Sequence, residues 1–513
     1  MAAVLSFERA VCRGGADDDE GEYMQSPRMS EASAECVGRS VSVVERQLAS
    51  KIASQELSVR CNGEIGDFYT VHGQVIGEGN FGKVRRACVK VSGAPRAVKA
   101  IEKALTRTKT GHAKQEVAVM TALDHPNIVL LYDVFEDQDY QYLVMELCAG
   151  GHLLDRIGRA ENGHMAEDDS ARAMLQILRA ISYMHNMSIC HRDVKADNCL
   201  FGRESADSCI IKVCDFGLSR IFKPTDVFVA RVGTPTHWAP EVLDRKYTKD
   251  CDLWACGVVC FHMLAGKLPF SDENDCEEVR VCTITFEGDA WRDRSEEGKH
   301  LIWQLLQKDP AGRPSPADAL RSRWFKEYGR KDEGAVFTTG QLESLRSFRS
   351  LGRLKRIGIE VMTQLLGDQE LRGSRDLFAA LDRNGDGLVS LVELQSRLER
   401  SRKVGSKARR VAGAIFREHS DDLESDRPFT YSEFVAATTP RRLLLDDALC
   451  RAAFRFLDTD GDGYISAKEL QAAKSLRHNR LADIRRLIRE HDLNGDGCLD
   501  FREFLRLMRM GEM

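Results

Sequence analysis

The stretch HRDVKADN, residues 191–198, is the strongest architectural signal in this chain, and DFG follows it at residues 215–217. Carboxylate and amide oxygens are groups that bind Mg²⁺, and an ammonium group beside them balances negative charge on a bound molecule. Together the two stretches predict a site for a magnesium ion and an anionic ligand. Its side chains would be those of Asp193, Lys195, Asn198 and Asp215.

A glycine-rich stretch, GEGNFGKV at residues 77–84, comes earlier in the chain. Missing side chains let a backbone approach phosphates closely, but GxGxxG alone also occurs in dinucleotide-binding folds. Here Val84 continues a strand instead of opening a helix, and the strand-like AVKAI supplies Lys99. Glu116 lies on a helical pattern, from which it could pair with Lys99 and hold that lysine on the phosphates. The order of these elements favours a nucleoside triphosphate site.

Together these elements resemble the eukaryotic protein kinase family over about residues 68 to 325. The resemblance implies an α+β, bilobal kinase fold that uses ATP and Mg²⁺. It implies that Asp193 orients the substrate hydroxyl and accepts its proton, while Lys195 neutralises the transferring phosphoryl group. Lys195, together with the tripeptide Gly-Thr-Pro at residues 233–235, is a pattern that resembles the serine/threonine branch of the family. In that branch Thr234 would contact Asp193 and Lys195. The implied catalytic residues are Asp193, Lys195, Asn198, Lys99, Glu116 and Thr234.

LVMELC, residues 143–148, resembles the hinge that holds adenine in this family. Met145 would be the gatekeeper, and Glu146 and Cys148 would offer backbone hydrogen bonds. Cys214, next to DFG, either faces the nucleotide pocket or is a small core residue. The implied nucleotide-binding residues are Ile76, Gly77, Gly79, Gly82, Val84, Ala97, Lys99, Met145, Glu146, Cys148 and Asp215, with Asn198 and Asp215 holding Mg²⁺.

Further matches to the kinase pattern are interpreted as fold maintenance. They include APE at residues 239–241, in which Glu241 is expected to pair with Arg313, and Asp252 in DLWACG. The apolar run LWACGVVCFHMLAG, which starts at Leu253 and contains His262, is too short for a bilayer span. We expect it to form a buried helix.

Two departures from the family pattern concern substrate choice and activation. His152, in GGHLL, stands where arginine-directed relatives carry an acid, and Asp197 shortens the usual glutamate, so a preference for arginine before the target is in doubt. Arg192 could clamp a phosphate carried by the activation segment, yet Ala230, four residues before Thr234, occupies the usual acceptor position. Thr225 is the remaining hydroxyl there. We therefore expect activation to come from elsewhere.

Similar twelve-residue units repeat in the C-terminal part: DRNGDGLVSLVE at 382–393, DTDGDGYISAKE at 458–469 and DLNGDGCLDFRE at 492–503. Each has oxygen groups at alternating positions, glycine at position six and glutamate at position twelve, as in an EF-hand calcium loop. We predict three Ca²⁺-binding EF-hands. The expected ligands are Asp382, Asn384, Asp386, Leu388 carbonyl, Ser390 and Glu393; Asp458, Asp460, Asp462, Tyr464 carbonyl, Ser466 and Glu469; and Asp492, Asn494, Asp496, Cys498 carbonyl, Asp500 and Glu503.

DLESDRPFTYSE, residues 422–433, occupies the second slot of this repeat but departs from it. It keeps its carboxylates, whereas position six is Arg427 and Pro428 follows, and both restrict the turn that glycine allows. The preferred interpretation is that it completes the first lobe structurally, with calcium binding left open. Position eight is apolar in every unit and should pair neighbouring loops by a short strand contact: Val389, Phe429, Ile465 and Leu499.

QLESLRSFRSLGRLKRIGIEVMTQLL, residues 341–366, has the pattern of a basic amphipathic helix. A kinase domain, this junction and four EF-hands in two paired lobes resemble the calcium-dependent protein kinases of plants and protists, over about residues 68 to 510. The resemblance implies that the helix around 348–366 occludes the kinase at low calcium and that calcium-loaded lobes capture it. An inert connecting helix is the alternative.

A constitutively active kinase whose hands act as a calcium buffer or docking module is the competing function. A pseudokinase is disfavoured, because Lys99, Asp193, Asn198 and Asp215 are all present. By carboxylate count, loops three and four should bind calcium more tightly than loop one. The expected divisions are an N-terminal extension at 1–65, mostly disordered, a kinase domain at 66–326, a junction at 327–373 and EF-hands at 374–513.

Composition sets limits on location and partners. A net charge of −5 and a charged fraction of 30% give no case for nucleic acid or membrane as the main partner. Sixteen scattered cysteines without zinc-type spacing predict reduced thiols inside the cell. The start MAAVLS lacks the glycine needed for N-myristoylation. We expect a cytoplasmic monomer that acts on protein substrates, with the nucleus left open, and a solvated loop at 402–410 in preference to a lipid contact.

Overall fold

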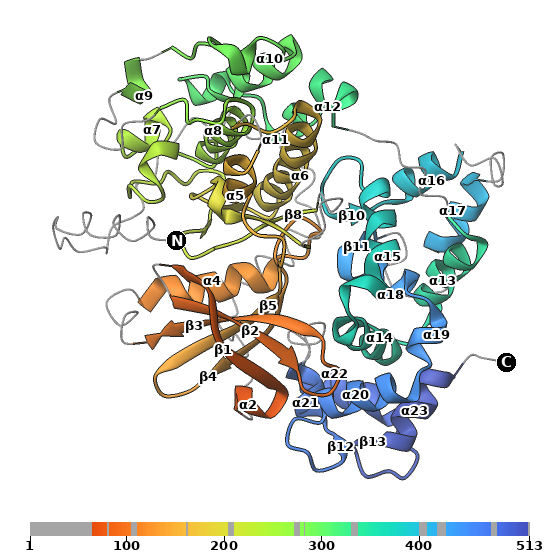
Figure 1. Ribbon diagram of the computed structural model, residues 1–513. Helices are drawn as coiled ribbons and strands as arrows, with labels where there is room; N and C mark the ends of the chain where they lie inside the picture. The colour runs from red at the N-terminus through yellow and green to blue at the C-terminus, as the bar shows by residue number, and fades with distance from the viewer. Residues whose placement is uncertain are drawn as a thin grey trace, which may run out of the picture.

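The computed structural model describes residues 64–510, apart from 80–81, 104–109, 161–162, 204–209, 271–277, 282, 330–336, 400–407, 418–426 and 473–479. The extension predicted at 1–65 lies almost wholly outside these residues, as does most of the basic stretch 402–410. Figure 1 shows a sheet-rich lobe, a helical lobe and a helical C-terminal module in chain order. The predicted α+β fold followed by an all-α module is confirmed.

The first lobe is a five-stranded antiparallel sheet in the order β1-β2-β3-β5-β4. Its central strand β3 is buried along almost its whole length, because β2 and β5 flank it on both sides. Helix α4 packs against this sheet and brings its acidic residue toward β3. The elements are α2 (Ile65–Phe68), β1 (Tyr69–Gly79), β2 (Gly82–Val89), β3 (Pro95–Glu102), α4 (Thr110–Ala122), β4 (Leu131–Glu136) and β5 (Tyr140–Glu146).

The second lobe is built around two long helices, α6 (Glu167–Asn186) and α8 (Cys251–Ala265). Helix α8 is buried along its length, which confirms the buried helix predicted from its apolar run. Gly266 ends it with a left-handed φ of 71°, where a Cβ would lie 2.0 Å from the Gly163 carbonyl oxygen. The remaining elements are α5 (Leu153–Gly158), β6 (Ile189–Cys190), β7 (Cys199–Phe201), β8 (Ile211–Val213), β9 (Arg220–Ile221), α7 (Pro240–Leu243), α9 (Glu278–Val281), α10 (Glu296–Leu305), α11 (Pro316–Ala319) and α12 (Arg323–Glu327).

The C-terminal module pairs its calcium loops through two short antiparallel strand contacts. Val389 lies opposite Phe429, and Ile465 lies opposite Leu499, so the predicted pairing at position eight is confirmed in both lobes. The elements are α15 (Asp368–Leu381), β10 (Leu388–Val389), α16 (Leu391–Glu399), α17 (Ala408–Arg417), β11 (Phe429–Thr430), α18 (Tyr431–Thr438), α19 (Arg441–Leu444), α20 (Asp447–Leu457), β12 (Tyr464–Ile465), α21 (Ala467–Ala472), α22 (Leu481–Arg489), β13 (Leu499–Asp500) and α23 (Phe501–Arg509).

The junction differs from the single helix expected over 341–366. It forms α13 (Thr339–Ser350) and α14 (Arg353–Leu365), separated by Leu351 and Gly352, both in extended conformations. Glycine is a poor helix former, and a capping box at Thr338 starts α13 as a separate helix. The apolar stripe is buried as expected. Its partners are helices of the EF-hand module: α17 and α18 for α13, and α18, α20 and α23 for α14.

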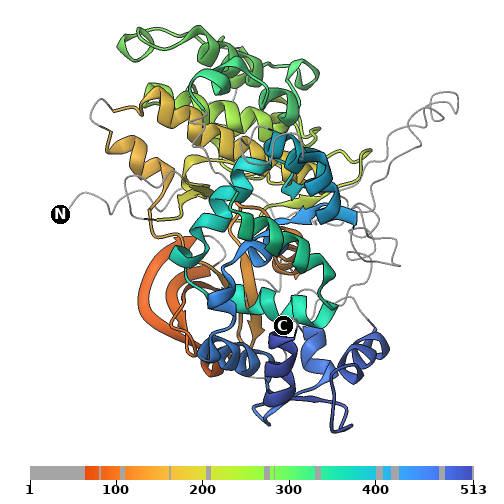
Figure 2. The ribbon, with the colours of Figure 1, turned by 90° about the vertical axis from the view of Figure 1, so that its right-hand side faces the viewer.

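The EF-hand module lies beside the hinge that joins the two kinase lobes (Figure 1). Figure 2, which looks onto that side, shows the module in front of the middle of the kinase domain. Direct bonds cross the interface: Ser432 Oγ donates to Asp124 Oδ1 at 2.7 Å, and Arg96 donates to the Gln364 carbonyl. Within the described part of the chain, no helix is both long and apolar enough to span a bilayer.

Candidate active site and calcium loops

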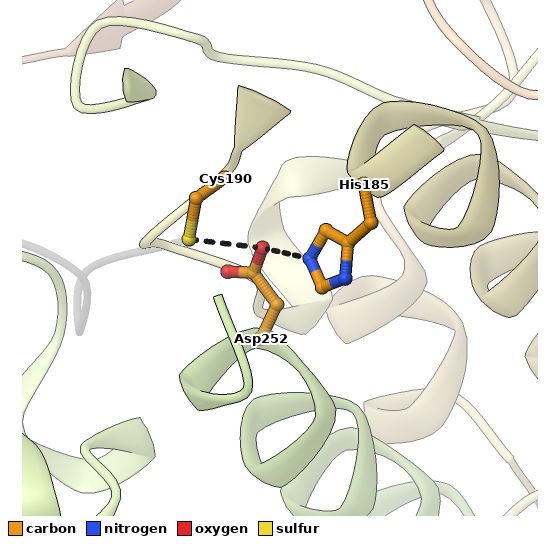
Figure 3. A group of neighbouring side chains, drawn as sticks. All are labelled: His185, Cys190 and Asp252. Atoms are coloured by element: carbon orange, nitrogen blue, oxygen red, sulfur yellow. Dashed lines mark hydrogen bonds and ion pairs between the residues drawn. The ribbon is translucent and has the colours of Figure 1, made fainter. Parts of the chain in front are cut away.

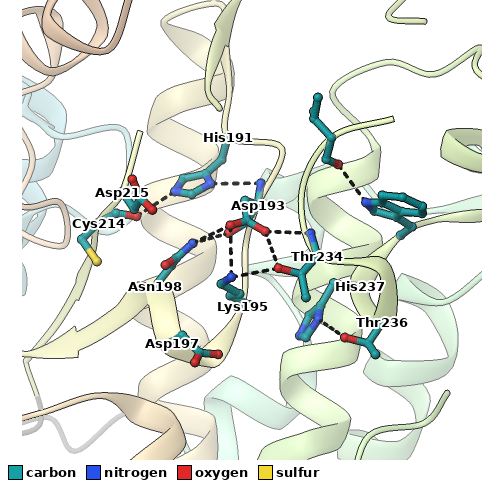
Figure 4. Close-up of polar contacts among 12 residues, drawn as sticks. His191, Asp193, Lys195, Asp197, Asn198, Cys214, Asp215, Thr234, Thr236 and His237 are labelled. Carbon is teal, nitrogen blue, oxygen red and sulfur yellow. Dashed lines mark hydrogen bonds and ion pairs between the residues drawn. The ribbon is translucent and has the colours of Figure 1, made fainter. Parts of the chain in front are cut away.

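The catalytic loop brings Asp193, Lys195, Asn198 and Thr234 into one hydrogen-bonded group (Figure 4). Asp193 Oδ1 accepts from the Thr234 hydroxyl at 2.8 Å and from its N–H at 3.0 Å. Lys195 Nζ donates to Thr234 Oγ1 at 2.9 Å and lies 3.4 Å from Asp193 Oδ2. Asn198 Nδ2 donates to the same Oδ2 at 3.0 Å. The structure therefore brings Thr234 into contact with Asp193 and Lys195, as the sequence predicted, and adds Asn198 to the group.

A second group forms where β3, α4 and DFG meet. Lys99 Nζ lies 2.7 Å from Glu116 Oε1 and 3.2 Å from Asp215 Oδ1. Burial alone would lower the pKa of Lys99, but the two carboxylates outweigh it and raise that pKa above its ordinary value. Burial works to raise the pKa of Asp215, and Lys99 more than reverses this, so the pKa of Asp215 is lowered. Both groups thus stay charged at neutral pH, as phosphate and magnesium binding require.

A buried aspartate holds the catalytic loop in place. Asp252 accepts from the backbone N–H groups of His191 at 2.9 Å and Arg192 at 2.8 Å. It also accepts from His185 Nε2 at 2.8 Å and Cys190 Sγ at 3.3 Å (Figure 3). Because both carboxylate oxygens are bonded to loop N–H groups, this His-Cys-Asp cluster is a structural clamp. The fold-maintenance role predicted for Asp252 fits this geometry.

Glu146 of the hinge uses its backbone and its side chain in different contacts. The Glu146 N–H donates to the Leu130 carbonyl at 2.9 Å, so the carbonyl is the group of this residue that we expect to meet adenine. Its side chain is 2.8 Å from Lys212 Nζ and 3.4 Å from Arg375 Nη1 of the EF-hand module. The sequence did not reveal this buried ionic link between hinge and module, because its members are far apart in the chain.

Gly82 and Gly77 of the phosphate loop differ in whether their surroundings leave room for a side chain. Gly82 has φ of 153°, and a Cβ there would lie 2.1 Å from the Ala100 carbonyl oxygen of β3. Glycine is therefore required at this position by the sheet itself. A Cβ at Gly77 would only make an ordinary 3.7 Å contact with Val84.

His152 and Asp197, the two departures from the family pattern that concern substrate choice, are in direct contact. The His152 ring donates from Nδ1 to the Asp197 carbonyl at 2.6 Å. Arg192, in the stretch 191–198, reaches the activation segment: its Nε donates to the Leu218 carbonyl at 2.8 Å, and its guanidinium lies over the Phe228 ring. Tyr247 donates its hydroxyl to the Ala230 carbonyl at 2.6 Å. These contacts order the segment without a phosphate group.

The predicted pair between Glu241 and Arg313 is confirmed. Arg313 Nη1 and Nη2 lie 2.5 and 2.8 Å from the two Glu241 carboxylate oxygens, and both side chains are buried. Bidentate geometry is the strongest form of this interaction. Removing one partner leaves the other charge buried and unpaired.

We expect Arg313→Met to destabilise the kinase domain by about 3–5 kcal/mol. The matched control is Arg321→Met, because Arg321 pairs with Asp318 on the surface, where the side chains are 78% and 59% exposed. Urea unfolding followed by circular dichroism measures both variants. Equal losses of stability would contradict the assignment of the buried pair as the structural one.

The three complete calcium loops share one geometry. In each, the carboxylate at position one accepts from the N–H groups at positions four and six, as Asp458 does from Gly461 at 2.9 Å and Gly463 at 3.0 Å. The carboxylates of Asp458, Asp460 and Asp462 converge within 4.8 Å of one another. Glycine at position six is left-handed in every loop, with φ of 74°, 89° and 83° at Gly387, Gly463 and Gly497. These oxygen ligands fit Ca²⁺.

Loop one is also a contact surface for the kinase. A Cβ added at Gly385 would lie 2.6 Å from Arg179 Cγ, and one at Gly387 would lie 2.7 Å from the Tyr183 ring, both on α6. The glycines of loops three and four meet nothing within 4 Å. Burial, and next the neighbouring Asp386, raise the pKa of Asp382 to about 7. Loop one therefore resides in a different environment from the other two.

The lobes, the catalytic group and the paired loops define a protein kinase joined to an EF-hand module. A family model described as Protein kinase domain matches residues 70–325, one described as EF hand matches 375–398, and one described as EF-hand domain pair matches 446–509.

The chain is 32% identical over 463 residues to "Calcium-dependent protein kinase 5" of Plasmodium falciparum, covering 88% of this chain and 80% of that protein. It is 33% identical over 454 residues to "Calcium-dependent protein kinase 11" of Oryza sativa subsp. japonica, covering 87% and 77%. The chain belongs to the calcium-dependent protein kinase family and is a serine/threonine protein kinase regulated by calcium.

Proposed function

We propose that this protein transfers the γ-phosphoryl group of ATP to serine and threonine hydroxyls of protein substrates, and that calcium in its EF-hands relieves inhibition by the junction. The observation that carries the transfer step is the Asp193, Lys195 and Thr234 group, with Asp193 Oδ1 and Lys195 Nζ bonded to one Thr234 hydroxyl. Magnesium, when bound by Asn198 and Asp215, supplies charge neutralisation of the phosphates.

The residues of the chain divide the work of transfer. Asp193 orients the substrate hydroxyl and takes its proton as the bond to phosphorus forms. Lys195, held in place by Thr234, balances charge on the transferring group, while Glu116 holds Lys99 on the remaining phosphates. Adenine is placed at the hinge by the Glu146 carbonyl and the Cys148 backbone. The γ-phosphoryl group leaves ADP and joins the substrate oxygen.

The position of the junction supports the regulatory half of the proposal. Helices α13 and α14 bury their apolar stripe against EF-hand helices on the hinge side of the kinase. Phe348 is 4% exposed and Met362 is fully buried there. A basic amphipathic segment held in this way is a target that calcium-loaded hands capture. We propose that at low calcium the segment leaves this position and covers the catalytic cleft of a cytoplasmic monomer.

The test is phosphate transfer from ATP and Mg²⁺ to a serine/threonine peptide array by the full-length protein, first with chelator and then with micromolar free calcium. We expect activity with calcium and at least about tenfold less with chelator, because sensor hands act in this concentration range. Equal activity in both conditions would leave a kinase whose hands are a buffer or docking module. The array also reports whether His152 has relaxed an arginine preference.

A further inference from the structure

The second hand holds its position-twelve glutamate with a side chain of its own. Arg427, at position six, lies with Nη1 at 3.1 Å from Glu433 Oε2 and Nη2 at 2.5 Å from Glu433 Oε1. The Thr430 N–H also donates to Oε2, at 3.1 Å. Both oxygens of Glu433 are therefore engaged by a cation that belongs to the chain.

The other three hands show what this glutamate does without such an arginine. Glu393, Glu469 and Glu503 each accept from the N–H at position nine, at 3.0, 2.7 and 2.9 Å, just as Glu433 does from Thr430. Each also accepts from the N–H at position two, at 3.1, 2.6 and 2.7 Å. These partners are neutral groups of the loop, and position six is glycine in all three. A calcium ion would supply the positive charge there.

The guanidinium group is chemically suited to replace that ion at the glutamate. Calcium takes both oxygens of the position-twelve carboxylate, and an arginine fork matches the same two oxygens in plane. The charge is permanent, because arginine does not lose its proton in proteins. Glu433 is largely buried, with 16% of its side chain exposed, whereas that of Arg427 is 37% exposed. Glu433 is therefore the more firmly packed member of the pair, and Arg427 lies on its solvent side.

The second hand is also in contact with the junction helix α13. Arg349, on α13, donates to the Arg427 carbonyl oxygen. Its guanidinium lies 4.1 Å from the ring centre of Phe429 and 4.8 Å from that of Phe416. Phe429 in turn pairs with Val389 of loop one. The second hand therefore contacts both the junction helix and its calcium-binding partner loop.

We propose that Arg427 is a built-in cation of the second hand, taking the place of calcium at Glu433. The hand keeps its strand contact with loop one at every calcium concentration. The protein then binds three calcium ions, and loop one closes against a partner already in place. Calcium responsiveness in the first lobe is confined to loop one. Only the activity measurement below rests on the proposed function; ion count and stability do not.

The experiment compares Arg427→Gln with Arg383→Gln in the full-length chain. Arg383 is an exposed arginine at position two of loop one, so its removal gives the same charge change in the same lobe. Calorimetric titration with CaCl₂ should count three ions in the wild type and in both variants. In chelator, Arg427→Gln should unfold about 2 °C or more below wild type. Arg383→Gln should not.

The activity measurement follows half-maximal activation by calcium. Arg427→Gln should require about two- to fivefold more calcium, the range expected for one partly exposed ion pair. Arg427→Lys keeps the positive charge but loses the two-pronged contact with the carboxylate. Its calcium requirement should therefore lie between those of the wild type and Arg427→Gln. Four ions in the wild type would overturn the proposal, since calcium would then displace the arginine. Unchanged stability of Arg427→Gln in chelator would overturn it as well, whatever the activity.

Discussion

Asp193→Asn should reduce phosphoryl transfer by about 10²–10⁴-fold, the usual contribution of a positioned general base. The amide oxygen can still accept from the Thr234 N–H and hydroxyl, whereas the contacts of the second carboxylate oxygen with Asn198 and Lys195 are lost. It cannot take a proton from the substrate hydroxyl. Steady-state kinetics with peptide and ATP measure the loss, and fluorescence titration with a nucleotide analogue measures ATP binding, which should stay near the wild-type value.

The matched control for this variant is Thr225→Ala, which removes a hydroxyl from the activation segment. It should retain wild-type activity, because Arg192 and Ala230 already have partners there. A comparable loss in both variants would mean that the segment needs phosphate on Thr225. Loss of ATP binding in Asp193→Asn would mean that the residue has a structural role and would remove the argument for a base.

The active site could be predicted from the sequence because its signals are local. HRDVKADN sets three of its side chains within six positions, and the order of glycine loop, lysine and acidic helix places Lys99 beside Glu116. The strand contacts between loops also followed from one apolar residue at position eight of each unit. Such features depend on spacing along the chain.

The contacts between the kinase and the EF-hand module could not be predicted in this way. Glu146 meets Arg375, and Asp124 meets Ser432, across more than two hundred positions of sequence. Nothing in the local pattern distinguishes these residues from other surface charges. Gly352, where the junction divides into two helices, is present in the sequence, but the basic amphipathic pattern continues through it and favoured a single helix. The ion pair between Arg427 and Glu433 could have been predicted from their opposite charges at positions six and twelve. Arg427 was instead interpreted only as a steric obstacle to the turn.

The last prediction concerns the order in which the hands fill. Loops three and four carry four carboxylates each and are open, whereas loop one carries three and is packed on Arg179 and Tyr183. A neighbouring guanidinium and the burial of Asp382 both oppose the binding of a divalent cation there, because ionised ligands are costly to bury. The second lobe should therefore fill at lower calcium, and loop one should set the threshold for activation.

The double variant Glu469→Gln with Glu503→Gln should raise the calcium needed for half-maximal activity by at least about tenfold, because both strong sites lose a bidentate charged ligand. Glu393→Gln should leave the two tightest ions in a calorimetric titration and still impair activation. Calcium titrations of binding and of peptide phosphorylation, made on the same samples, separate these effects. In the single variants Glu393→Gln, Glu469→Gln and Glu503→Gln, equal calcium affinities would contradict the order, since a loop packed against a kinase arginine would then bind as tightly as two open ones.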